Sequence, residues 1–484
     1  MGIHMPLNEK SSIKIDLGGA ESQNPKNPLL LSSKGRYIWD ELPFCAESDG
    51  GTISIDRDVE LYEGYGSLKG AYLAATKKHF PFNGKIPPKE FFLHPQYNTW
   101  IELMYDQTEK DIMKYAESIV ENGFKPGILM IDDNWMVDYG DWRFSAERFE
   151  NPAEMCKKLK EMGFKIMLWV CPFVSPDSAN FRKLEKEGGL LIGADGKPAI
   201  RFWWNGYSAV LDMTNPKAQE WFKGELNTLV NEYGVDGFKF DAADPYMYRI
   251  DDKSFVPTKT IMDQTEAYCR FAMQYDYNEL RAGYKNGGTP LVMRLADKKH
   301  SWNKNGLNTL VPNSIVQGLS GYAYHCPDMV GGGELGDFRE NKDKLDNELF
   351  VRYAQASALM PMMQISASPW RVLDKEHSDM VKAAMELHDK FGELILSLAE
   401  HAAKTGEPII RHMAYEFPDC KMEEVSDQFM LGSDILVAPV LQKCVRERYV
   451  KLPMGKWQTA DGTVYTESGI IPAPLETLLY LKKI

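Results

Sequence analysis

An aspartate at the end of an apolar segment is the first residue of this sequence that could do chemistry. Asp241 follows the mostly apolar segment 235–240, and two alanines come directly after it. Lys239 stands two positions earlier, so on an extended strand its side chain leaves from the same face as Asp241. A nearby cation keeps a carboxylate ionised, as a nucleophile must be. The same pattern is typical of a structural ion pair, so a second residue is needed to define a reaction.

A second aspartate supplies that partner. Asp297 stands just past another predicted strand, residues 290–295. Glycoside cleavage requires two carboxylates beside one bond: one attacks the anomeric carbon, and the other protonates the leaving oxygen. A separation of about 5 to 5.5 Å gives retention of configuration, and a wider gap gives inversion. The sequence therefore suggests Asp241 as nucleophile and Asp297 as acid/base, without fixing the distance between them.

The elements around these residues alternate in a regular way. From about residue 90, short apolar runs such as 127–131, 165–170 and 235–240 predict strands. Runs of helical spacing between them predict helices, among them 151–162 with Asn151 placed to cap, and 217–233, and this order is typical of a parallel α/β fold. Polar residues recur where strands end, and in a barrel those ends converge on one mouth. No Gly-x-Gly-x-x-Gly motif follows a strand, which disfavours a dinucleotide-binding sheet. We expect a (β/α)8 TIM barrel whose mouth carries Asp132, Asp133, Trp169, Asp241 and Asp297.

Two other regions flank the predicted barrel. Residues 1–88 contain period-two alternation at 51–56, which predicts a small N-terminal β domain ending in a linker rich in turn formers at 80–88. After about residue 398, strand-like segments at 429–439 and 446–452 are separated from later ones by turn signals. We therefore expect the barrel over 89–397 and a C-terminal β-sandwich over 398–484.

Composition narrows the class of protein. The formal net charge of −13 argues against nucleic-acid binding. The seven cysteines are scattered and predict neither disulfides nor a zinc site. No run is long and apolar enough for a membrane span. The segment Met1–Met5 lacks the apolar core of a signal peptide, so a soluble protein of the cytoplasm or periplasm is expected, with the compartment and any homo-oligomer left open.

These residues also carry a resemblance. The chain resembles glycoside hydrolase family 31, in which a Lys-x-Asp strand end bears the nucleophile, and Lys239 and Asp241 match that pattern. In the family a sugar-binding arginine precedes the acid/base by sixteen residues with Gly-Gly between, as Arg281 precedes Asp297 here. Further segments match in order along the chain: 318–321, 327–332, 406–411, 427–432 and 436–439.

The resemblance implies a retaining, double-displacement α-glycosidase that acts on an oligosaccharide or glycoside and uses no metal or cofactor. It places Arg281 and Asp132 on sugar hydroxyls and Trp169 in the wall of the sugar site. We expect the full set of substrate-binding residues to be Asp132, Asp133, Trp135, Trp169, Trp204, Lys239, Arg281, Arg294, Trp302 and Asp328.

Departures from the family pattern bear on the sugar. Arg294 replaces a tryptophan, Pro327 a histidine and Cys171 an asparagine, and the segment 201–207 is unlike that of common α-glucosidases. With the segment from Cys326, it resembles the branch that contains the myogenesis-regulating glycosidase and bacterial α-galactosidases. Changed hydroxyl contacts fit a sugar of different C4 configuration, so the sequence favours an exo-acting α-galactosidase over an α-glucosidase or another α-glycosidase.

Three alternatives stay open. A shifted alignment would put Asn305 at the acid position, and an amide cannot donate a proton as an acid would. The protein would then be a crippled enzyme or an engineered trap. A carbohydrate-binding protein that has lost catalysis is the second alternative. A transglycosylase would use the same site with a sugar in place of water as the acceptor.

Overall fold

The computed structural model describes residues 8, 10–18, 24–340 and 345–484, so Met1–Met5 lies outside the described residues. The chain divides into two compact units. The first unit comprises residues 1–17, 24–95 and 285–484, and the second comprises residues 18–23 and 96–284. No helix among the described residues is both long enough and apolar enough to cross a bilayer.

The second unit is built on five parallel strands. Their order is β16-β15-β11-β8-β7, and every neighbouring pair runs parallel. Nearly all their residues are buried, which explains why the sequence shows continuous apolar runs here and not alternation. The strands are β7 (Gln96–Asn98), β8 (Ile128–Ile131), β11 (Lys165–Val170), β15 (Gly237–Phe240) and β16 (Tyr277–Leu280).

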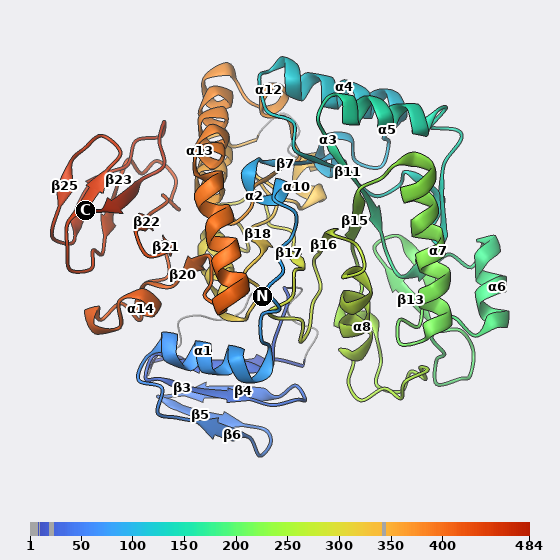
Figure 1. Ribbon diagram of the computed structural model, residues 1–484, viewed down its shortest axis with the longest axis horizontal. Coiled ribbons are helices and arrows are strands. Elements are labelled where there is room, and N and C mark those ends of the chain that lie inside the picture. The colour runs from blue at the N-terminus through green and yellow to red at the C-terminus, as the bar shows by residue number, and fades with distance from the viewer. Residues whose placement is uncertain (1–7, 9, 19–23, 341–344) are drawn as a thin grey trace. The chain divides into compact units, whose positions relative to one another are not determined.

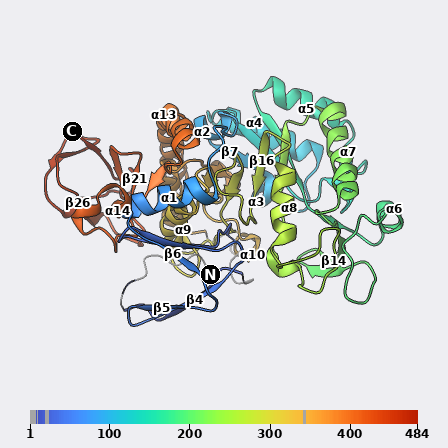
Figure 2. The same ribbon diagram turned by 60° about the horizontal axis from the view of Figure 1, so that its bottom comes forward.

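Helices flank these strands, and they begin where the sequence predicts. α5 (Pro152–Glu161) starts with Asn151 accepting a hydrogen bond from the Glu154 amide, and α7 (Pro216–Tyr233) is capped in the same way by Asn215. Both carry proline in the first turn, where its missing N–H costs nothing. α5 packs against α7 and against α4 (Glu109–Glu121), and the three helices stand beside the strands in Figures 1 and 2.

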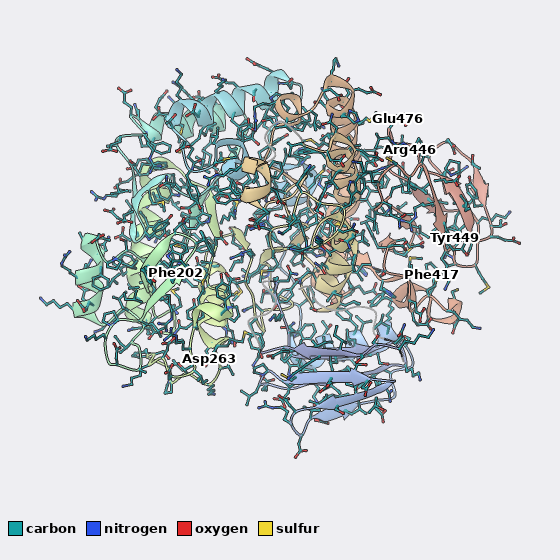
Figure 3. The ribbon with its side chains drawn as sticks, turned by 180° about the vertical axis from the view of Figure 1, so that it is seen from behind. Phe202, Asp263, Phe417, Arg446, Tyr449 and Glu476 are labelled. Atoms are coloured by element: carbon teal, nitrogen blue, oxygen red, sulfur yellow. The ribbon has the colours of Figure 1, made fainter. Side chains whose placement is uncertain are left out.

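A hairpin also projects from the second unit. It consists of β13 (Ile200–Trp203) and β14 (Gly206–Val210), with Trp204 and Asn205 at its turn. Phe202 on β13 is 70% exposed and lies at the surface in Figure 3. Trp203 points the other way and is buried, stacked on Phe173 with ring centroids 4.4 Å apart. The hairpin therefore has one packed face and one open face.

The first unit holds the remaining parallel strands, β17 (Val292–Arg294), β18 (His325–Cys326) and β19 (Gln364–Ile365). β17 pairs parallel with β18, and Gln364 makes a parallel bridge to Met329. These three and the five strands of the second unit make up the eight strands of a (β/α)8 barrel, which confirms the fold class predicted from the sequence.

The N-terminal part of the first unit is a β domain, as predicted. It contains two three-stranded antiparallel sheets, ordered β1-β4-β5 and β2-β3-β6. The predicted strand at 51–56 is β5 (Thr52–Ile55), paired with β4 (Cys45–Asp49). The helix α1 (Leu68–His79) packs on β3 (Arg36–Trp39) through Tyr72 and Ala75, and Figure 1 shows it lying along that sheet.

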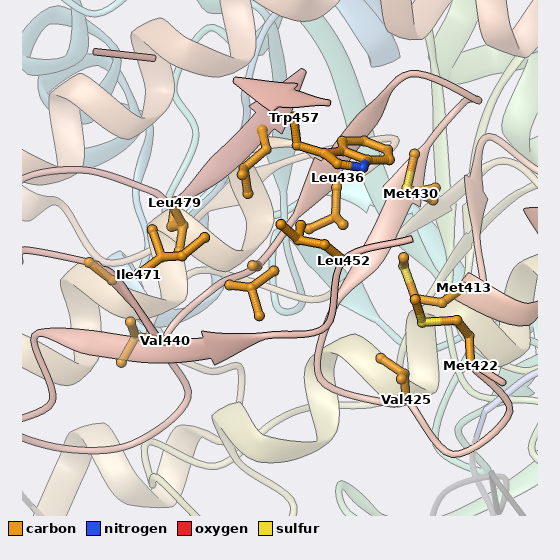
Figure 4. Packing of buried hydrophobic residues seen from close by; sticks show 14 of the residues in the cluster. Met413, Met422, Val425, Met430, Leu436, Val440, Leu452, Trp457, Ile471 and Leu479 are labelled. Atoms are coloured by element: carbon orange, nitrogen blue, oxygen red, sulfur yellow. The ribbon is translucent and has the colours of Figure 1, made fainter. Parts of the chain in front are cut away.

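The C-terminal part of the first unit begins after a long helix. α13 (Lys375–Thr405) has 31 residues, so the predicted domain boundary at 397 falls inside it. A six-stranded sheet and a two-stranded sheet follow. The segment 429–439, predicted as one strand, is a hairpin of β21 (Phe429–Leu431) and β22 (Ile435–Val437), because Gly432 adopts a φ of 60° and turns the chain. Figure 4 shows the core of this part, where Trp457 and Leu436 are fully buried.

Candidate active site

Asp241 lies directly after β15, and both its carboxylate oxygens accept hydrogen bonds. Oδ2 accepts from the indole Nε1 of Trp169 at 2.8 Å. Oδ1 accepts from the backbone N–H of Ala242 at 2.8 Å and from Nε of Arg281 at 3.2 Å. The Asp241 side chain keeps 13% of its surface exposed. A carboxylate that is oriented by donors and still accessible is suited to attack an electrophile.

The backbone after Asp241 is unusual. Ala242 and Ala243 both have a φ of 59°, in the left-handed region that side-chain-bearing residues rarely adopt. Each such residue costs on the order of 1 kcal/mol and is kept only where the surroundings require it. Asp241 itself is fixed by its backbone N–H, which donates to the Val170 carbonyl of the neighbouring strand β11 at 2.8 Å.

Lys239 forms a buried ion pair with Asp132. Its Nζ lies 2.6 Å from Oδ2 of Asp132, the first residue after β8. The two side chains are only 5% and 2% exposed. The sequence had suggested Lys239 as the cation for Asp241. The structure gives Lys239 a carboxylate partner at the end of another strand and adds Arg281 as a cation on Asp241.

Asp133 is held by two side chains that the sequence did not single out as site residues. It accepts hydrogen bonds from Tyr139 O–H at 3.2 Å and from the Asn205 amide at 2.7 Å. Burial, with the neighbouring Asp132 carboxylate as the second cause, raises the pKa of Asp133 to about 7. Asn205 in turn accepts from Tyr105 O–H at 3.1 Å, so the hairpin turn is tied to the strand ends.

The tryptophans of the second unit have different surroundings. Trp135 is fully buried, and its Nε1 donates to the Trp169 carbonyl at 2.8 Å, so it supports the residue that contacts Asp241. Trp204 is 42% exposed at the hairpin turn, and the Arg281 guanidinium lies over its ring, 5.3 Å from the centroid. Of these, Trp204 offers a surface that a sugar ring could stack against.

Arg281 joins two carboxylates. Besides its Nε contact with Asp241, its Nη2 donates to Oδ2 of Asp244 at 2.6 Å. Asp244 has no exposed side-chain surface. Asp244 is not among the site residues predicted from the sequence, although it stands only three residues after Asp241.

A second cluster lies in the first unit and is centred on Arg294 at the end of β17. Arg294 Nη1 donates to Asp297 Oδ1 at 2.7 Å and to Asp328 Oδ1 at 2.6 Å. Asp328 Oδ2 accepts the backbone N–H of Lys298 at 2.6 Å. Burial raises the pKa of Asp328 to about 6, although the Arg294 charge acts in the opposite direction. Asp297 is 31% exposed and Asp328 is fully buried, so Asp297 alone of the pair is open to a ligand.

The loop after Asp297 contains two further residues considered from the sequence, Trp302 and Asn305. Nζ of Lys298, a fully buried side chain whose pKa burial lowers to about 8, lies 3.3 Å from Oδ1 of Asn305. The Asn305 amide donates to the Asp297 carbonyl at 3.2 Å. Trp302 donates to Asp346 Oδ2 at 3.0 Å, and Asp346 caps α11 (Asn347–Ala358). Among the described residues, no three histidine, cysteine or acidic side chains gather as metal ligands.

Enzymes with a (β/α)8 fold carry their active sites at the C-terminal ends of the strands, and glycoside cleavage uses a pair of carboxylates. The chain matches the glycosyl hydrolases family 31 TIM-barrel domain over residues 93–395 and the family 31 C-terminal domain over residues 406–483. It therefore belongs to glycosyl hydrolase family 31, as its motifs had indicated.

Individual relatives extend this assignment. The chain is 31% identical over 416 residues to the myogenesis-regulating glycosidase of Mus musculus, a match covering 84% of this chain and 58% of that protein. It is 24% identical to the α-xylosidase XylQ of Lactiplantibacillus pentosus over 93% of this chain and 61% of the relative. It thus spans less than two thirds of either relative. A solved family 31 α-xylosidase from a soil metagenome, complexed with xylose, has the same fold, with a TM-score of 0.84 at 19% identity, covering 100% of this chain and 77% of that one.

Proposed function

We propose that this protein is a retaining, exo-acting α-glycosidase that removes a terminal α-linked hexose, with Asp241 as its nucleophile. The observation that carries the proposal is the environment of Asp241. Its carboxylate stands at a strand end, accepts from Trp169, Ala242 and Arg281, and remains partly exposed. Family 31 membership supports the same assignment.

The proposed reaction has two steps. Asp241 attacks the anomeric carbon, while Asp297 transfers its proton to the leaving glycosidic oxygen, so that a glycosyl–enzyme ester and a free alcohol form. Asp297, now ionised, takes a proton from water, and the resulting oxygen nucleophile displaces Asp241 from the sugar. Each displacement inverts the anomeric centre, so the product keeps the substrate's configuration. Besides the substrate and water, the two proposed steps use only the Asp241 and Asp297 side chains.

The assignment of Asp297 as acid/base rests on its place in the sequence and on its local contacts. It stands sixteen residues after Arg281, as the family pattern requires. Arg294 fixes one of its oxygens at 2.7 Å, and its partial exposure gives a leaving group access. Because the same Nη1 of Arg294 also donates to Asp328, we propose that Asp328 serves the acid/base through Arg294.

The terminal sugar is proposed to be galactose. Arg294, Pro327 and Cys171 stand where the family has other residues, and this alters the set of groups that can contact sugar hydroxyls. The remaining binding roles are proposed for Asp132, Asp133, Trp169 and Trp204. α-Glucosidase activity is the alternative within the family.

A panel of p-nitrophenyl α-glycosides tests this function. We expect the α-galactoside to be cleaved with the highest kcat/KM, and the α-glucoside and α-xyloside more slowly. Preference for the α-glucoside would reject galactose as the terminal sugar and favour α-glucosidase activity. Preferential cleavage of a β-glycoside would reject the proposal, and NMR of the first-formed anomer would show whether configuration is retained.

A second candidate function, sugar binding without hydrolysis, is favoured by one observation. Asn305 lies in the Asp297 loop, is exposed, and has an amide oxygen beside the buried Lys298 ammonium, a position that a carboxylate would suit. Asn305→Asp separates the two functions. If Asp297 is the acid/base, this substitution changes kcat by less than about threefold, and Asp297→Ala abolishes hydrolysis of poor leaving groups. If Asn305 occupies the acid position, Asn305→Asp raises kcat by about 100-fold or more.

A further inference from the structure

Arg281 occupies a confined position between Asp241 and Asp244. Its Nε lies 3.2 Å from Oδ1 of Asp241, and its Nη2 lies 2.6 Å from Oδ2 of Asp244. The Trp204 ring lies against the guanidinium, with the central carbon 5.3 Å from the ring centroid. The arginine side chain is 7% exposed. Its planar fork can therefore face Asp241 only in the orientation that these neighbours impose.

The backbone explains why Asp244 reaches this arginine. Only Ala242 and Ala243 separate Asp244 from Asp241, and both are in the left-handed region, with φ of 59°. The chain passes through these two residues from β15 to a short 3-10 helix, η1 (Pro245–Met247). Asp244 stands directly before that helix, with its carboxylate on Arg281. The strained backbone is thus the feature that lets two carboxylates so close in sequence share one cation.

The Asp244 carboxylate depends on its contact with Arg281 because it is buried. The Asp244 side chain has no exposed surface, and a buried carboxylate is stable only where charge or hydrogen bonds compensate it. The short Nη2 contact is a charge-assisted hydrogen bond, which is stronger and more directional than a neutral one. Asp244 therefore fixes one arm of the guanidinium, and the geometry of the fork then determines where Nε points.

We propose that Asp244 is a positioning residue for the glycosidase reaction: it holds Arg281 so that Nε is directed at the attacking carboxylate of Asp241. This inference rests on the proposed function, in which Asp241 is the nucleophile. Asp244 does not contact the sugar. It acts through Arg281, so its effect disappears when Arg281 can no longer donate to Asp241.

A double-mutant cycle in the full-length protein tests the proposal. Asp244→Asn is nearly isosteric and removes the charge. We expect it to lower kcat/KM for the best p-nitrophenyl α-glycoside by about 100-fold, because the loss of one oriented hydrogen-bond donor typically slows an enzyme by that factor. In an Arg281→Met background, the same Asp244→Asn change lowers kcat/KM by less than about threefold, because the two residues act as one unit. Equal losses in both backgrounds, or full activity of Asp244→Asn, would overturn the proposal.

Arg281→Lys provides an independent variant if Asp244→Asn does not fold. Lysine keeps the charge but lacks the fork that joins the two carboxylates, so we expect kcat/KM to fall at least about 10-fold. Activity near that of the unmodified protein would contradict the positioning role.

Asp236→Asn is the matched control. Asp236 stands just before β15, its side chain is 12% exposed, and it pairs with Lys160 and Lys165 at 3.4 Å, away from Asp241 along the strand. It should keep kcat/KM within about twofold. Asp241→Asn in the same assay separates the two proposals. Unchanged hydrolysis by Asp241→Asn rejects the proposed function, whereas an inactive Asp241→Asn beside a fully active Asp244→Asn rejects only the role of Asp244.

Discussion

The indole N–H of Trp169 donates to Oδ2 of Asp241 across 2.8 Å, and this hydrogen bond joins the neighbouring strands β11 and β15 at the site of the proposed chemistry. Trp169 is itself fixed by a second hydrogen bond, in which the indole N–H of Trp135 donates to its backbone carbonyl. An oriented donor fixes the plane of the carboxylate before it attacks, so little reorganisation is needed during the reaction.

Trp169→Phe removes the donor and keeps an aromatic ring in place. We expect kcat to fall about 10- to 100-fold, because the lost hydrogen bond orients the nucleophile. KM should change less than about threefold, because the phenyl ring keeps an aromatic surface in the proposed sugar site. Steady-state kinetics on a p-nitrophenyl α-glycoside measures both constants.

Trp457→Phe is the control for that experiment. Trp457 is also fully buried and donates to a backbone carbonyl, that of Pro453, in the C-terminal core. Its replacement should lower thermal stability by the loss of one hydrogen bond, about 1 kcal/mol, and leave kcat unchanged. If both variants lost kcat to the same extent, the Trp169 effect would be a general consequence of destabilisation.

Trp204→Ala tests the exposed indole at the hairpin turn. Loss of a stacking surface worth about 1 kcal/mol should raise KM about fivefold to 10-fold with a smaller change in kcat. Phe202→Ala is the comparison, because Phe202 belongs to the same hairpin and is more exposed, at 70% against 42%. Equal kinetic effects of the two substitutions would argue that the hairpin as a whole, and not the Trp204 ring, meets the substrate.

Asp133 should make stability depend on pH. Its pKa in the folded protein is about 7, whereas an unfolded aspartate titrates near about 3.9. Between these values the folded state retains a proton that the unfolded state has released, so its contribution to stability is lost as pH rises through about 7. Asp133→Asn removes that dependence. Calorimetric melting temperatures from pH 4.5 to pH 7.5 should therefore fall less for the variant, and parallel curves would contradict the prediction.

Arg294 should be essential for stability as well as for the Asp297 contact. Arg294→Met leaves the Asp328 carboxylate buried without this cation. Loss of one partner of a buried ion pair lowers the free energy of unfolding by about 3 to 5 kcal/mol. Adding Asp328→Asn to Arg294→Met removes the buried charge and should recover part of the loss. Urea unfolding measures both free energies. A double variant no more stable than Arg294→Met would show that the pair is not the source of the effect.

Local patterns were sufficient to predict the barrel strands and the capped helices. The segment 165–170 is β11, and Asn151 caps α5, because buried parallel strands and N-caps depend on residues close in sequence. Asp241 and Asp297 were predicted in the same way, from their places after expected strands, whereas Arg281 was predicted from the family resemblance. The family assignment followed from those spacings.

Contacts that depend on tertiary structure could not be predicted. The pairing of Lys239 with Asp132 joins two strands separated by β11, and Asn205 reaches Asp133 only because the hairpin turns there. The left-handed alanines that bring Asp244 onto Arg281 carry no sequence signal, since alanine seldom adopts that conformation. Likewise Gly432 splits a continuous apolar segment into two strands.

Trapping of the glycosyl–enzyme ester tests the central claim most directly. A 5-fluoro-α-glycosyl fluoride of the preferred sugar has a good leaving group and forms an ester that hydrolyses slowly, so mass spectrometry of a proteolytic digest can locate the attached sugar. We predict a single labelled peptide whose modified residue is Asp241, and no labelling of Asp241→Asn. A sugar attached to another carboxylate, or turnover that inverts configuration without any covalent label, would contradict the account.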